Sequence, residues 1–144
     1  MVLSGGANCI FCAIVEHREP ALRVFESSSV LAFLPLAPAA FGHTLIIPKR
    51  HVGDLWEITK EEMSNVMEVS LVIAHAIKEA ISPDGLNLIN SSGAAATQTV
   101  PHFHVHLMPR RKGDSMGRIW PESPNWKEGD LLKMAHMIRV NIEI

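Results

Sequence analysis

Residues His102 to Leu107 alternate strictly between histidine and an apolar residue, in the order His-Phe-His-Val-His-Leu. Because successive side chains of a β-strand point to opposite faces, this pattern predicts a strand with its imidazoles on one face and Phe103, Val105 and Leu107 in the core. At about 3.3 Å per residue, neighbouring histidines on that face stand about 7 Å apart and the outer two about 13 Å apart. One phosphate-sized group can therefore touch only two of them.

The middle histidine of this strand, His104, is the candidate nucleophile. A neutral imidazole can attack phosphorus near pH 7, because a pKa of about 6.5 leaves one ring nitrogen unprotonated. Two other interpretations stay open, a solvated strand face and a metal site of the His-x-His kind. A cupin-like metal site would also require a Glu about four residues beyond His104, where this chain has Met108 and Pro109. The pattern favours the nucleophile.

The segment before the strand is a loop of small residues, Asn-Ser-Ser-Gly-Ala-Ala-Ala-Thr-Gln-Thr over positions 90–99. With almost no bulky side chains, its backbone N–H groups could approach an anion closely. Gln98 and Thr99 could donate hydrogen bonds to phosphate oxygens or to a leaving oxygen. A flexible polar hairpin loop is the alternative, but the position beside the histidines favours a phosphate-binding loop.

An amphipathic helix is predicted from Thr59 to Ile81, where apolar residues recur at three- and four-residue steps. Thr59 and Glu62 form a capping box at its start, and Pro83 with Gly85 ends it. Strands are expected over residues 23–33, 43–47, 86–89 and 100–108, a loop over 112–129 and a last helix over 130–140.

Composition and charge exclude several classes of protein. The net charge of −2 provides no basic surface for long nucleic acids, and no apolar run is long enough to cross a membrane. Residues 1–7 show no secretory signal, so we expect a cytoplasmic protein of one domain over residues 1–144. Cys9 and Cys12 lie too close together to connect distant parts of a disulfide scaffold, so they need another explanation.

The chain resembles the histidine triad (HIT) family, whose signature of alternating histidines is matched by residues 102–108, followed by Pro109 and Arg110. Further matches extend the resemblance over residues 9–110 and leave 111–144 as a variable C-terminal segment. They are Cys9 to Cys12, Leu31 to Leu34, Gly42 to Lys49, His51, and Gln98 to Val100.

This resemblance implies an α+β fold with a five-stranded antiparallel sheet, one long helix and a C-terminal helix. Two such sheets usually pair into a ten-stranded sheet in a homodimer. The partner is a small nucleotide, with neither nucleic acid nor membrane involved.

The resemblance also implies an enzyme, a phosphoramidase or hydrolase that forms a nucleotidyl-histidine intermediate on His104. It releases a nucleoside monophosphate, such as AMP from adenosine phosphoramidates or dinucleoside polyphosphates. His106 and Thr99 correspond to phosphate-contacting residues, and Gln98 to the residue that handles the leaving-group oxygen. Asn90 lies where the family often has an active-site asparagine. The alternative is a zinc-stabilised nucleotide-binding module with little turnover.

Four residues match the zinc ligands of the zinc-containing branch of the family, namely Cys9, Cys12, His51 and His102. Two thiolates and two imidazoles make a closed tetrahedral site, so the implied Zn²⁺ is structural and the chemical step needs no metal. A thioredoxin-like redox pair and two plain buried thiols are the alternatives for the cysteines.

The chain departs from the family at two positions. Pro35 stands where an Asp commonly binds the ribose hydroxyls, and Thr97 replaces a Gly. The base and the sugar of the substrate therefore cannot be carried over from the family.

Overall fold

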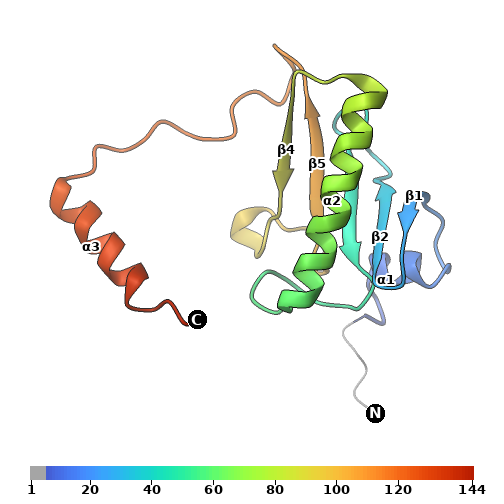
Figure 1. The fold of residues 1–144 in the computed structure, drawn as a ribbon, viewed down its shortest axis with the longest axis horizontal. Coiled ribbons are helices and arrows are strands. Elements are labelled where there is room, and N and C mark those ends of the chain that lie inside the picture. Colours follow the sequence, from blue (N-terminus) through green and yellow to red (C-terminus); the bar gives the residue numbers. More distant parts are fainter. Residues whose placement is uncertain (1–5) are drawn as a thin grey trace. The chain divides into compact units, whose positions relative to one another are not determined.

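The computed structural model describes residues 6–144, which fall into two compact units that divide after Lys112 (Figure 1). The first unit contains a five-stranded sheet in the order β1-β2-β3-β5-β4, and every neighbouring pair is antiparallel. The strands are β1 (Leu22–Glu26), β2 (Val30–Leu34), β3 (Thr44–Pro48), β4 (Gly85–Ile89) and β5 (Val105–Arg110). The predicted α+β architecture is confirmed.

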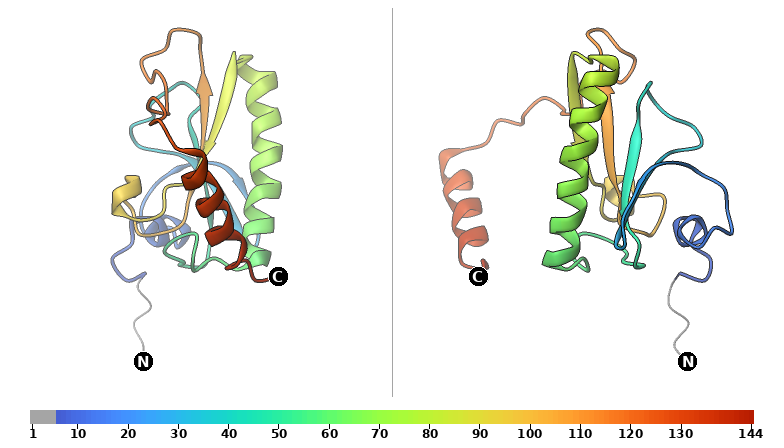
Figure 2. Two further views of the ribbon diagram at one scale, coloured as in Figure 1. Left: turned by 90° about the vertical axis from the view of Figure 1, so that its left-hand side faces the viewer. Right: turned by 45° about the vertical axis from the view of Figure 1, so that its right-hand side comes forward.

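The long helix α2 (Lys60–Ile81) covers one face of the sheet (Figures 1 and 2). Thr59 accepts the Glu62 N–H while the Glu62 carboxylate accepts the Thr59 N–H, so the predicted capping box is present. The helix ends at Ser82, which takes the left-handed conformation. Its buried side chains Val66, Ile73 and Ile77 pack on a core that includes Phe103, Val105 and Leu107, as the alternation predicted.

The opposite face of the sheet is covered by the short helix α1 (Ile10–Val15). Phe11 and Ile14 pack there against side chains of β2 and β3, such as Leu31 and Leu45. Along β2 and β3 these residues alternate with those of the α2 core, which places the two clusters on opposite faces. Sequence periodicity did not predict α1, because six residues span fewer than two helical turns.

The histidine strand begins later than predicted. We expected a strand over residues 100–108, but β5 starts at Val105 and continues to Arg110. Phe103 donates its N–H to Val52 O, in a loop, so residues 102–104 approach the sheet without joining its ladder. Two of the three histidines therefore lie in an irregular segment that their side-chain hydrogen bonds hold in place.

The second unit, residues 113–144, carries helix α3 (Glu128–Arg139) and no buried side chain in that helix. The prediction of a last helix over residues 130–140 was correct within two residues. Trp120 and Trp126 are both exposed. Whether the chain forms one domain stays a prediction. Among residues 6–144, no helix has the length and apolar character that crossing a bilayer requires.

Candidate functional site

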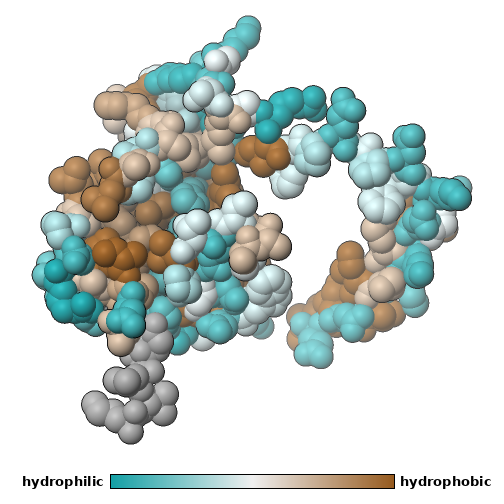
Figure 3. All heavy atoms as spheres, turned by 180° about the vertical axis from the view of Figure 1, so that it is seen from behind, coloured by the Kyte–Doolittle hydropathy of each residue, from teal (hydrophilic) through white to brown (hydrophobic). Residues whose placement is uncertain are grey.

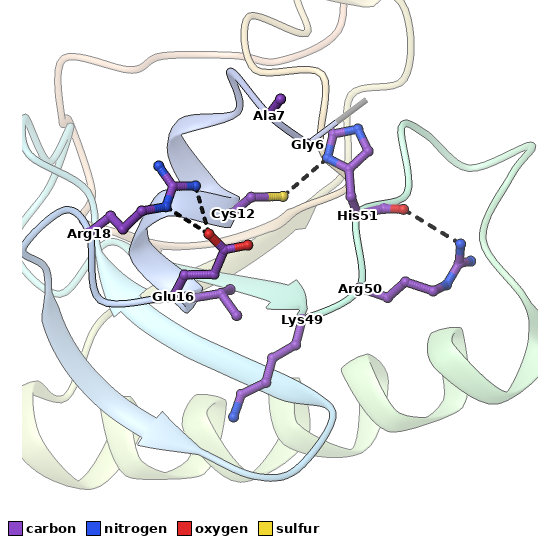
Figure 4. A pocket seen from close by; sticks show the side chains of 9 residues that line it. Gly6, Ala7, Cys12, Glu16, Arg18, Lys49, Arg50 and His51 are labelled. Atoms are coloured by element: carbon purple, nitrogen blue, oxygen red, sulfur yellow. Dashed lines mark hydrogen bonds and ion pairs between the residues drawn. The ribbon is translucent and has the colours of Figure 1, made fainter. Parts of the chain in front are cut away.

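Four side chains from separate parts of the first unit converge at the start of α1. Cys9 precedes that helix, Cys12 lies within it, His51 follows β3 and His102 precedes β5. One ligand atom of each lies within 4.8 Å of the other three. Figure 4 shows Cys12 and His51 pointing toward one another. The predicted ligand set is thus brought together.

The spacing of these atoms fits a tetrahedral metal site. Zn–S bonds of about 2.3 Å and Zn–N bonds of about 2.0 Å require sulfur and nitrogen to lie about 3.5 Å apart around a tetrahedral ion. Cys12 Sγ lies 3.3 Å from His51 Nδ1 and 3.5 Å from His102 Nδ1, and Cys9 Sγ lies 3.5 Å from the same His102 nitrogen. These three separations therefore match the edges of such a tetrahedron.

The surroundings of the cluster prepare His102 as a ligand. Its Nε2–H donates to Pro48 O at 2.8 Å, which leaves Nδ1 with a free lone pair facing the cysteines. Burial lowers the pKa of His102 to about 4, so the ring is neutral at pH 7. Burial and the neighbouring Cys9 raise the pKa of Cys12 to about 12, because a second buried thiolate is unfavourable without a cation. A divalent ion would supply that missing charge.

The ring of His104, the nucleophile candidate, is held by the backbone two residues earlier. Its Nδ1–H donates to the carbonyl oxygen of His102 at 2.7 Å, so the lone pair is on Nε2. Burial lowers the pKa of His104 and keeps the ring neutral at pH 7. The edge of the Phe11 ring packs against it, with ring centroids 5.2 Å apart. This geometry fixes which nitrogen can attack.

His106 is set in the complementary tautomer by His43. The Ala39 N–H donates to His43 Nδ1 at 3.1 Å, so the proton of the neutral His43 ring is on Nε2. That Nε2 lies 2.9 Å from His106 Nδ1, which must then accept and leave the His106 proton on its own Nε2. Burial lowers the pKa of His43 and lowers that of His106 to about 4. His106 is therefore a neutral N–H donor beside the neutral ring of His104.

His104 and His106 line one end of a cavity of about 520 Å³ on the α1 side of the sheet. Their ring centroids are 4.9 Å apart, within reach of one phosphate group. The predicted histidine face is therefore real, but it does not face solvent. His102 is 0 % exposed and His104 5 % exposed, because α1 covers that face.

Thr99 also lines this cavity, whereas Gln98 and Asn90 do not. The Gln98 amide donates to Gly53 O and Val100 O and accepts the Gly93 N–H. Gln98 thus connects two loops through backbone contacts. Its predicted contact with the leaving-group oxygen stays a prediction.

Asn90 reaches His104 through the backbone. Its Nδ2–H donates to the carbonyl oxygen of His104 at 2.9 Å, and its Oδ1 accepts the hydroxyl proton of Ser92. Ser92 in turn accepts the Leu55 N–H. Asn90 therefore holds the backbone of His104 in this structure, and a direct contact with substrate stays a prediction.

Sequence reasoning gave His43 no role. The signal was present, because His43 directly precedes a buried strand whose neighbour carries the histidines. Thr44 pairs with Leu107 and Leu45 with His106, so a residue just before Thr44 lies close to the site. Assigning a role to His43 required the register in which β3 pairs with β5, and the sequence alone does not give that register.

Thr97, one of the two departures from the family pattern, has a strained backbone. Its φ of 69° and ψ of 22° lie in the left-handed region, where a β-branched residue is unfavourable. Thr97→Gly should raise the free energy of unfolding by about 1 kcal/mol, because relief of strain outweighs the added freedom of the unfolded chain. Ala96→Gly, in the adjacent 3-10 turn, should lower it by about 0.5 kcal/mol. Urea denaturation of both variants checks this, and a destabilised Thr97→Gly protein would contradict it.

The comparison with known proteins identifies the class. The HIT domain model matches residues 16–113, and the chain belongs to the HIT family. A HIT family structure from Bacillus subtilis is 37 % identical, with a TM-score of 0.88 over 95 % of this chain and 99 % of that chain. A Zn-bound histidine triad protein from Mycobacterium smegmatis is 37 % identical, with a TM-score of 0.73 over 95 % and 98 % of the two chains.

Among curated relatives, the adenosine 5′-monophosphoramidase of Schizosaccharomyces pombe is 34 % identical over 118 residues. The match covers 81 % of this chain and 86 % of that protein. The recognised family and fold are thus confirmed by sequence and by structure, and the family includes proteins named as nucleotide hydrolases.

Proposed function

We propose that this chain is a nucleotide phosphoramidase or hydrolase that works through a nucleotidyl-histidine intermediate. The observation that carries the proposal is the pairing of tautomers, a lone pair on His104 Nε2 beside the N–H of His106. A phosphate between the two rings would meet a nucleophile at phosphorus and a hydrogen-bond donor at a nonbridging oxygen. Supporting it are the cavity, the membership of the HIT family and the likeness to a named phosphoramidase.

The reaction proceeds in two displacements. His104 Nε2 forms a bond to the α-phosphorus as the phosphoramidate P–N bond breaks, and the departing nitrogen takes one proton from solvent and leaves as the amine. Water then attacks the same phosphorus and gives one proton back to solvent, the P–Nε2 bond breaks, and the nucleoside monophosphate is released. The sum is phosphoramidate plus water giving AMP plus ammonia. With a dinucleoside polyphosphate, the P–O bond of the anhydride breaks instead.

The remaining predicted residues act around this phosphorus in the proposal. His106 and Thr99 hold nonbridging oxygens, and Gln98 assists the departing group. Asn90 fixes the backbone of His104. His43 keeps the His106 proton on Nε2, the nitrogen that would donate to the phosphate.

We also propose that Cys9, Cys12, His51 and His102 bind a structural Zn²⁺, as the donor spacing and the Zn-bound relative support. The ion would hold α1 against the sheet and takes no part in the displacement. Thiol ligands stay reduced in the cytoplasm, where we place the protein.

A homodimer is the proposed assembly. β4 lies at one edge of the sheet and carries partly exposed apolar side chains, Leu86 and Leu88. Two β4 edges pairing would bury them and produce the predicted ten-stranded sheet.

The test is release of AMP from adenosine 5′-phosphoramidate by the zinc-loaded protein. We expect steady AMP formation and, after rapid alkaline quenching, a peptide containing His104 that carries one adenylyl group. Binding of AMP without turnover or adduct would instead establish the alternative, a zinc-stabilised nucleotide-binding module. If the protein neither bound AMP nor cleaved the phosphoramidate, the proposed function would be rejected for this substrate.

A further inference from the structure

The cavity that holds His104 and His106 has two chemically different ends. The polar end is formed by these two rings with His43 and Thr99. The rest of the described lining is almost entirely apolar, and Figure 3 shows apolar side chains gathered on this face of the sheet, opposite α2. Its main members are Phe11, Ile14, Phe33, Leu34, Pro35 and Leu36.

A nucleotide bound with its phosphate at the histidines places its sugar next to that apolar wall. A site that recognises sugar hydroxyls needs hydrogen-bond partners in the wall. The last residue of β2 and the segment that follows it provide Leu34, Pro35, Leu36 and Ala37 to the lining, with no polar side chain, and Pro35 lacks even a backbone N–H. A hydroxyl placed there gains no partner from these side chains.

Glu19 is the one carboxylate in the described lining. Its side chain is exposed to solvent, and its backbone N–H is tied to Ala13 O. A hydrated carboxylate at the rim gains little from exchanging water for a sugar hydroxyl. Glu19 would therefore contribute less to recognition of the sugar hydroxyls than a buried carboxylate would.

We propose that this pocket does not read the sugar hydroxyls, so that 2′-deoxynucleoside 5′-phosphoramidates are processed as well as the ribonucleoside compounds. The proposal rests on the proposed function, because it assumes that phosphate occupies the histidine end. The ligand is recognised by its phosphate and by an apolar, planar group against Phe11 and Phe33. Discrimination by the sugar is lost.

The experiment compares kcat/KM for the 5′-phosphoramidates of adenosine, 2′-deoxyadenosine and 2′,3′-dideoxyadenosine. We expect the three values to agree within about threefold, since an apolar wall discriminates weakly against a missing hydroxyl. A preference for the ribonucleotide of about tenfold or more would overturn the proposal. Glu19→Gln should leave the ratio unchanged, and a preference that this variant abolishes would show that Glu19 reads the sugar.

A matched pair of variants tests the wall itself. Pro35→Asp should create a ribonucleotide preference of about tenfold, the effect of one hydrogen bond to a charged group, whereas Pro35→Ala should create none. Calorimetric titration with AMP and 2′-deoxy-AMP makes the same comparison without turnover. If no phosphoramidate is cleaved, the proposed function fails. Equal dissociation constants for AMP and 2′-deoxy-AMP would still support a pocket that does not recognise the sugar hydroxyls. A tenfold difference between them would still overturn that proposal.

Discussion

Removing the metal from the purified protein is expected to destabilise the first unit by about 4 kcal/mol or more. An ion present at about 1,000 times its dissociation constant contributes about 4 kcal/mol to the folded state, and structural zinc binds tightly enough to reach that regime. For a unit of this size the melting temperature should fall by more than about 15 °C. The cause is that α1 has six residues and no side-chain cap, so its position depends on the metal ligands together with the packing of Phe11 and Ile14 on the sheet.

Calorimetric unfolding with and without a chelator measures this effect. Cys12→Ser should reproduce the loss in untreated protein, because a serine hydroxyl is a poor zinc ligand. His75→Ser, on an exposed turn of α2, removes a histidine outside the cluster and should change the melting temperature by less than about 2 °C. The proposal of a structural ion would be contradicted if the chelated protein melted at the original temperature, or if elemental analysis found no zinc in untreated protein.

The second large effect is on catalysis. His104→Asn should lower kcat with adenosine 5′-phosphoramidate by about 1,000-fold or more, because it removes the attacking nitrogen. The asparagine amide can still donate to the carbonyl oxygen of His102, as Nδ1 of the histidine does at 2.7 Å. The fold and the affinity for AMP should therefore remain near those of the original protein.

Three measurements separate chemistry from structure in that variant. They are the melting temperature, the dissociation constant of AMP and the yield of adenylylated peptide after quenching. His75→Asn is the matched control and should keep full activity. If His104→Asn kept more than a tenth of the original kcat, or if the adduct formed on another residue, His104 would not be the nucleophile.

The sequence predicted those parts of the fold that have a repeating pattern. The 3.6-residue period and the capping box at Thr59 gave α2 within one residue, and the alternation after His102 gave the two faces of β5 correctly. α1 was missed, since a helix of six residues shows no period. The start of β5 was placed too early, because residues 102–104 alternate like a strand while their hydrogen bonds lead to a loop and to side chains.

The metal ligands were predicted as a set because the resemblance to the zinc-containing branch of the HIT family covers all four residues, whereas the CxxC spacing alone left a redox pair and two buried thiols open. The contacts of Gln98 and Asn90 were not, since both amides are used on backbone groups of distant loops. His43 was missed for a related reason. Its role depends on a hydrogen bond between residues 63 positions apart, which only the strand register brings together.

Two parts of the chain line the cavity, the segment that carries the histidines and the short helix α1, and they would contact different parts of a ligand. His104, just before β5, and His106, within it, contribute the rings that would act on phosphorus in the proposed reaction, whereas α1 contributes Phe11 and Ile14 to the wall that the rest of the ligand would contact. Substitutions in α1 could therefore shift the range of accepted compounds while the reacting nitrogens stay in place. In such a chain, evolution can change the accepted substrates through a few residues of α1, while the neighbouring cysteines keep that helix in place.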